Sequence, residues 1–164
     1  MVTNFHEIYQ TYAGDVYRFV YWLCGNAQDA EDITSETFVR ALTAGGEVRA
    51  ETVKGYLLTI AKNLTYKSSN REKRFVPLQA DFLDSQAGPS QLVEQSMSLQ
   101  SAMQFIQILP DVDRAALVLR IQNDLPYEEI AGILGISLTA AKVKVHRSRL
   151  KLTEYMHQQE EPHS

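Results

Sequence analysis

Apolar residues recur at helical spacing along most of the first half of the chain. Over Phe5–Leu23 they fall three, four and seven positions apart, which is the period of one face of an α-helix. The pattern then breaks, and Asn26 can cap a second helix over Ala27–Ala44 by accepting a hydrogen bond from a free backbone N–H. The predicted buried stripe of this second helix is Ala30, Ile33, Thr37, Phe38 and Ala41. A third helix is predicted from about Thr52 to about Arg74. Its apolar stripe ends at Leu64 and gives way to polar and basic residues; the stripe consists of Val53, Tyr56, Leu57, Ile60, Ala61 and Leu64.

The second half of the chain shows the same periodicity after an interruption. Residues 76–91 contain two prolines and a glycine without lasting periodicity, which is typical of a linker. Helical spacing returns over Leu92–Leu109, and Asp111 can cap a following helix that is apolar nearly all round over Ala115–Ile121, as in a buried helix. The pattern therefore predicts an all-α chain with domains at 1–75 and 92–157, the flexible linker 76–91 and a polar tail at 158–164.

The second domain ends in two short helices separated by a tight turn. Pro126 precedes the first of them, where its missing N–H costs nothing. Gly135 can take the left-handed conformation that ends this helix, and Ser137 can cap the next one. A helix, a glycine turn and a basic helix are the signature of a helix-turn-helix, whose second helix enters the major groove of DNA. The predicted apolar stripe of that second helix is Leu138, Ala141, Val145 and Leu152.

A net charge of −4 by itself argues against binding to nucleic acid, but the uneven distribution of the charges reverses that inference. Ten of the sixteen Lys and Arg residues lie in two stretches, Lys62–Arg74 and Lys142–Lys151. Met1–Leu42 holds six acidic and only two basic residues. Such a chain can hold DNA at two basic surfaces and a different partner at an acidic one.

Other composition features exclude several classes of protein. A single cysteine, Cys24, excludes a disulfide scaffold and cannot form a metal site by itself. No apolar run approaches 18 residues and the N-terminus has no secretory signal, so we expect no membrane span and a cytoplasmic location.

Three stretches resemble the extracytoplasmic-function (ECF) sigma factors, the small alternative class of the bacterial sigma-70 family. DAEDITSETFVRAL is similar to the segment that docks on the β′ clamp helices of RNA polymerase, and VKGYLLTIAKNLTYKSSNREKR to the segment that recognises and opens the minus-ten element. YEEIAGILGIS and the basic helix after it resemble the reader of the minus-thirty-five element. The resemblance covers about residues 5–155 in the family's order, and implies domains of the region 2 and region 4 types.

The resemblance implies partners rather than catalysis. These are core RNA polymerase, through its β′ clamp helices and β flap, and promoter DNA; no covalent chemistry and no cofactor are implied. Many members are also silenced by an anti-sigma factor, which no residue of this chain indicates. An acidic helix face is most often merely solvated, but it also suits a basic partner. By resemblance the polymerase contacts are Asp29, Asp32, Glu36, Thr37, Phe38 and Arg40.

The end of the third predicted helix has the chemistry that unpaired DNA requires. Opened bases need stacking surfaces, hydrogen bonds to their edges and cations along the backbone. Asn63 offers both a donor and an acceptor, whereas Tyr66 could stack on a base or simply pack in the protein. The predicted minus-ten contacts are Tyr56, Lys62, Asn63, Tyr66, Lys67, Asn70, Arg71 and Arg74.

The basic helix of the helix-turn-helix supplies the duplex contacts. Lys142 and Arg147 suit phosphates or guanine edges, and His146 suits a phosphate contact or packing rather than catalysis. Ala140, Val143 and Lys144 depart from residues common in the family, which leaves the base preference open. The predicted minus-thirty-five contacts are Ser137, Thr139, Ala140, Lys142, Val143, Lys144, His146, Arg147 and Arg149.

Two alternatives from other classes of protein remain. A helix-turn-helix regulator acting without polymerase would more often be a dimer on a palindrome, and it would not need the Asp29–Arg40 segment. A carboxylate-bridged metalloenzyme would need Glu-x-x-His pairs, which are missing. Its candidate ligands would be His6, Glu31, Asp32 and Glu36.

Overall fold

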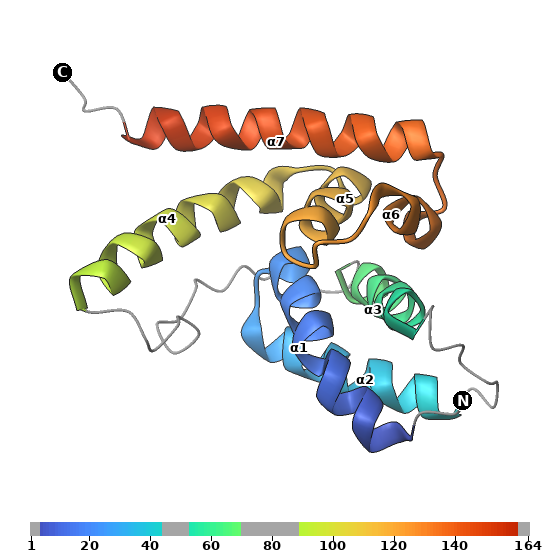
Figure 1. Cartoon of the computed structure of the whole chain (residues 1–164). Helices are drawn as coiled ribbons and strands as arrows, with labels where there is room; N and C mark the ends of the chain where they lie inside the picture. The colour runs from blue at the N-terminus through green and yellow to red at the C-terminus, as the bar shows by residue number, and fades with distance from the viewer. Residues whose placement is uncertain (1–3, 44–52, 70–88, 161–164) are drawn as a thin grey trace.

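The computed structural model describes residues 4–43, 53–69 and 89–160, with the side chains of residues 69 and 89–97 left out. Within these residues all regular secondary structure is helical, as predicted (Figure 1). The helices are α1 (Phe5–Cys24), α2 (Ala27–Thr43), α3 (Val53–Ser69), α4 (Pro89–Ile108), α5 (Asp111–Ile121), α6 (Tyr127–Leu134) and α7 (Leu138–Glu160).

Helices α1, α2 and α3 pack on one another and form the first domain. The predicted cap between α1 and α2 is confirmed: Asn26 Oδ1 accepts hydrogen bonds from the backbone N–H groups of Gln28 at 2.9 Å and Asp29 at 3.2 Å. Gly25 just before it has φ 71°, the left-handed conformation that ends a helix at little cost for glycine. The turn between α1 and α2 is therefore fixed by local sequence.

Helices α4 to α7 form the second domain, in which α5 is the central helix. All five residues of Ala115–Leu119 have no exposed surface, which confirms the prediction of a buried helix over these residues, whereas Ile121 at its end is 38% exposed. Two helix boundaries differ from the predictions, because α4 begins at Pro89, inside the predicted linker, and α7 continues to Glu160, inside the predicted tail. The predicted cap at Asp111 is wrong: Asp111 is the first helical residue, and Pro110 precedes it without a side-chain hydrogen bond.

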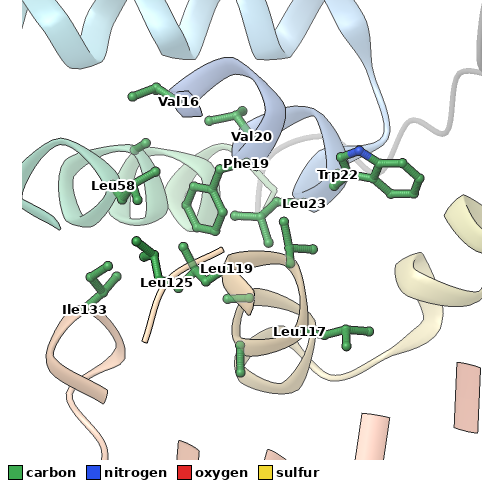
Figure 2. Close-up of a cluster of buried hydrophobic side chains, with 14 of the residues drawn as sticks. Val16, Phe19, Val20, Trp22, Leu23, Leu58, Leu117, Leu119, Leu125 and Ile133 are labelled. Atoms are coloured by element: carbon green, nitrogen blue, oxygen red, sulfur yellow. The ribbon is translucent and has the colours of Figure 1, made fainter. Parts of the chain in front are cut away.

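The two domains pack against each other through a shared apolar core (Figure 2). Phe19 and Leu23 of α1 lie in one cluster with Leu119 of α5 and Leu125 of the α5–α6 turn. Leu58 of α3 is fully buried although it lies off the apolar stripe predicted for that helix. The periodicity of α3 predicts the face that packs within the first domain, and Leu58 belongs to the face that the second domain helps to bury.

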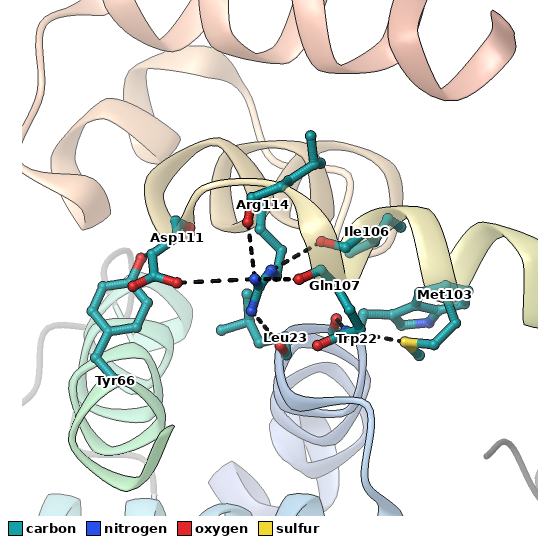
Figure 3. Close-up of polar contacts among 9 residues, drawn as sticks. Trp22, Leu23, Tyr66, Met103, Ile106, Gln107, Asp111 and Arg114 are labelled. Carbon is teal, nitrogen blue, oxygen red and sulfur yellow. Dashed lines mark hydrogen bonds and ion pairs between the residues drawn. The ribbon is translucent and has the colours of Figure 1, made fainter. Parts of the chain in front are cut away.

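Arg114 is the polar centre of this domain contact (Figure 3). Its guanidinium donates to backbone carbonyls at the end of α4, those of Ile106 at 2.9 Å, Gln107 at 2.7 Å and Leu109 at 2.9 Å. It also donates to the carbonyl of Leu23 at the end of α1, at 3.1 Å. The last carbonyls of a helix have no partner within it and carry the negative end of the helix dipole, so one partly buried cation stabilises two helix ends.

We predict that Arg114→Met lowers the free energy of unfolding by about 2–4 kcal/mol, because buried carbonyls of both helices lose a charged donor. Denaturant titration followed by circular dichroism measures the change. Arg18→Met is the matched control, since Arg18 is half exposed and its bond joins Asp15 within its own helix. The control should stay within about 0.5 kcal/mol of the parent. Equal midpoints for the two variants would contradict this role of Arg114.

Candidate nucleic-acid interface

The helix-turn-helix has the local geometry that the sequence predicts. Gly135 has φ 65° and ends α6, as expected of the turn glycine. Ser137 Oγ accepts a hydrogen bond from the backbone N–H of Ala140 at 3.0 Å, which confirms the predicted cap of α7. At the start of α6, Arg120 lies over the ring of Tyr127, 4.7 Å from its centroid, and this cation–π contact holds the first residue of the helix in place.

Helix α7 separates a buried stripe from an exposed basic face. Ala141 and Val145 are fully buried as predicted, whereas Leu138 is 38% exposed and does not belong to the stripe. Ser148 takes part in the stripe instead with 3% exposure, and its polar side chain concealed it from a search for apolar periodicity. Most of the predicted duplex contacts lie on the exposed side, namely Ser137, Thr139, Lys142, Val143, His146, Arg147 and Arg149.

Lys144 lies apart from these residues. Its ammonium group is 3.0 Å from a carboxylate oxygen of Asp113 in α5, and about a third of its side chain is exposed. Ala140 is also only partly exposed, next to the cap. The ion pair places Lys144 in the packing of α7 on α5, a role that no sequence spacing indicates because its partner lies 31 residues away.

A hollow of about 350 Å³ lies between α2 and α3 in the first domain. It brings together three predicted minus-ten residues, Tyr56, Asn63 and Lys67, one or two turns apart on α3. Arg40, which the sequence resemblance assigns to polymerase, lies on the opposite wall. The complete lining is Arg40, Thr43, Tyr56, Ile60, Asn63, Leu64 and Lys67.

Two other predicted minus-ten residues face the second domain instead of the hollow. Lys62 Nζ donates to the carbonyl of Ile133, near the end of α6, at 2.7 Å, and burial lowers the pKa of Lys62. Tyr66 Oη donates to the carbonyl of Asp111 at 3.3 Å. Burial, with a smaller contribution from the Asp111 carboxylate, raises the pKa of Tyr66 to about 12. Asn70, Arg71 and Arg74 lie outside the described residues.

The acidic face of α2 is only partly what the sequence predicts. Asp32 and Glu36 are exposed and Asp29 is half-buried. Thr37 and Phe38 are buried, with 0% and 2% of their surface exposed, so their side chains cannot contact a partner in this structure. Thr37 Oγ1 donates to the carbonyl of Ile33 at 2.7 Å, and the Phe38 ring packs edge-on against Tyr9 at 5.0 Å between centroids.

Sequence reasoning missed two exposed apolar residues on the same helix. Val39 and Leu42 are 56% and 59% exposed. The only signal in the sequence is that both lie off the buried stripe of α2, which is a signal that many surface residues share. Their position beside the acidic residues gives this face a mixed apolar and charged character.

Two further features concern metal binding and membrane spans. In the described ranges, no three His, Cys, Asp or Glu side chains are placed so that they could hold a metal ion. No helix of the same residues is long and apolar enough to cross a membrane.

The comparisons with known proteins match both domains. Sigma-70 region 2 matches residues 8–75, and Sigma-70 region 4 matches residues 99–152. The sigma factor SigM of Bacillus subtilis is 32% identical over 89% of this chain and 91% of its own length. SigE of Mycolicibacterium smegmatis is 32% identical over 93% of this chain, which spans only 62% of SigE. The chain belongs to the ECF sigma factors of the sigma-70 family, DNA-binding proteins of transcription initiation.

Solved structures support the fold assignment. The sigma factor RpoE of Bartonella quintana, solved in complex with the anti-sigma factor NepR, has a TM-score of 0.73 and 21% identity, covering 93% of this chain and 96% of RpoE. SigJ of Mycobacterium tuberculosis has a TM-score of 0.59 and 24% identity, covering 90% of this chain and 52% of SigJ. These identities are low, and the similarity establishes the fold alone.

Lys142 and Lys144 provide a matched test of the exposed face of α7. We predict that Lys142→Met lowers affinity for duplex DNA and reduces the slope of log K against log salt by about one, because one phosphate contact is lost. Lys144→Met removes the same charge two residues away but should leave the slope unchanged, since Lys144 is paired with Asp113. Fluorescence anisotropy of the full chain on one labelled duplex, over a salt series, measures both. Equal slopes for the two variants would show that the ion pair does not decide which lysine binds DNA.

Proposed function

We propose that this chain binds bacterial core RNA polymerase and directs it to promoters with defined minus-thirty-five and minus-ten elements, where it helps to open the DNA. The observation that carries the proposal is the occurrence, in one chain, of a capped and exposed basic helix on one domain and, on the other, a hollow lined by aromatic, amide and cationic side chains. A duplex reader and a receptor for unpaired bases are both needed for promoter recognition with opening. Polymerase and chromosomal DNA place this action in the cytoplasm.

The duplex reader is α7. Its N-terminal half presents Thr139, Lys142 and His146 at positions three or four apart, so that they form one exposed stripe, with Arg147 and Arg149 beside it. A helix of this kind fits the major groove, where arginine and lysine bind guanine edges or phosphates. Val143 on the same face suits the methyl group of thymine.

The receptor for unpaired bases is the hollow between α2 and α3. Tyr56 offers an aromatic surface, Asn63 offers an amide donor and acceptor, and Lys67 offers a cation. These are the three kinds of group that hold single-stranded DNA. Lys62, Tyr66, Asn70, Arg71 and Arg74 extend the proposed minus-ten contacts beyond the hollow.

The polymerase-docking surface is the exposed side of α2. Asp32 and Glu36 suit a basic partner, and the neighbouring Val39 and Leu42 offer apolar surface that docking can bury. Thr37 and Phe38 support this surface from inside the core. We assign this side to the β′ clamp helices and the second domain to the β flap, and an anti-sigma factor would act by covering such surfaces.

The direct test is transcription in vitro by core bacterial RNA polymerase on a pool of genomic promoter fragments, with and without the purified chain. We expect new start sites that depend on the chain and share upstream motifs. The absence of new start sites, together with no complex on a sizing column, would refute the proposal.

The two DNA surfaces should separate by mutation. We predict that Arg147→Ala weakens the affinity for the upstream duplex by about tenfold, as expected when a base or phosphate contact is lost. Asn63→Ala should spare this affinity and reduce opening, measured by the permanganate reactivity of thymines near the start site. Equal loss of duplex affinity in both variants would contradict the division of roles.

A helix-turn-helix regulator that acts without polymerase is the second candidate, supported by the geometry of α6 and α7 alone. It predicts tight, sequence-specific binding by the free chain, with half-sites arranged as a palindrome. It gives no role to the hollow, so Asn63→Ala would then have no effect on any readout.

A further inference from the structure

Arg40 occupies a position that its family resemblance does not predict. It lies in the last turn of α2 and forms one wall of the hollow, across from the α3 residues Tyr56, Asn63 and Lys67. Its guanidinium contacts one carboxylate oxygen of Glu36, through Nε at 3.2 Å and a terminal nitrogen at 3.0 Å. About half of each side chain in this pair is exposed.

We infer that Arg40 binds a backbone phosphate of the unpaired minus-ten strand in the hollow, rather than polymerase; this inference rests on the proposed function. A nucleotide has a flat base and an anionic phosphate. Tyr56 can stack on the base and Asn63 can form hydrogen bonds with its edge. Arg40 and Lys67 add cations from two different helices that line the hollow. The planar guanidinium can bind two phosphate oxygens at once, which a lysine cannot do.

The ion pair between Arg40 and Glu36 does not prevent Arg40 from binding a phosphate instead. An exposed pair within one helix contributes little to stability because water and salt screen it. A phosphate offers the same kind of oxygen acceptor as the carboxylate, with comparable geometry. Glu36 would then be released toward the docking face of α2, where it is exposed.

The experiment compares Arg40→Ala, Arg40→Lys and the control Arg18→Ala in two separate assays. Arg18 is also half exposed and paired within its own helix, but it does not line the hollow. The first assay measures the affinity of each chain for core polymerase. The second measures the affinity of the assembled complex for a single-stranded oligonucleotide covering a mapped minus-ten element, over a salt series.

We expect Arg40→Ala to reduce oligonucleotide affinity at least fivefold and to lower the salt slope by about 0.7, the value for one phosphate on a single strand. Arg40→Lys should restore the slope but only part of the affinity, and Arg18→Ala should match the parent. Polymerase affinity should change less than twofold in all three. Lower polymerase affinity with unchanged oligonucleotide binding by Arg40→Ala would overturn the inference, as would no change in either assay. Failure of the parent chain to bind polymerase would instead refute the proposed function.

Discussion

The structure depends on how the carboxyl ends of its helices are satisfied across the contact between domains. The last turn of a helix leaves carbonyls without partners, and burying them unsatisfied is costly. At the end of α1, the carbonyls of Trp22 and Leu23 accept hydrogen bonds from Gln107 and Arg114 of the second domain. In the opposite direction, Lys62 of the first domain donates to Ile133 near the end of α6. Each domain therefore completes a helix end of the other.

This arrangement is more specific than the apolar contact that accompanies it. The side chains of Phe19, Leu58 and Leu119 are buried together, but apolar burial has little directional preference. Hydrogen bonds from Arg114 to the ends of both α1 and α4 require one relative position of these helices. The apolar core thus favours association of the domains, and the polar contacts determine their orientation.

Much of the fold could be predicted because local rules decide it. The cap at Asn26, the left-handed Gly135 and the cap at Ser137 each involve neighbours within a few residues, and the structure confirms all three. The burial of α5 follows from its continuous apolar sequence. The contact between the domains could not be predicted, because periodicity identifies one buried face of a helix and Leu58 lies off that face.

The candidate sites also combine features that local sequence predicts with features that depend on tertiary contacts. The exposed face of α7 could be predicted from the helical period and the basic residues, and the grouping of Tyr56, Asn63 and Lys67 follows from their spacing on α3. Periodicity places Phe38 on the buried stripe of α2, which the structure confirms, whereas the family resemblance assigned the same residue to a partner. The roles of Lys62 and Lys144 depend on acceptors far away in the sequence, which spacing does not reveal.

These tertiary contacts change what the basic residues imply about DNA binding. Lys54 donates to the carbonyl of Asn123 at 3.1 Å, Arg120 donates to that of Leu125 at 2.9 Å, and Arg114 donates to that of Leu23 at 3.1 Å. Cations used in this way are not available to neutralise phosphates, and the net charge of −4 adds a general repulsion from DNA. The free chain should therefore bind nucleic acid weakly despite its two basic stretches. Under the proposed function, polymerase supplies the remaining affinity and this chain supplies the sequence preference.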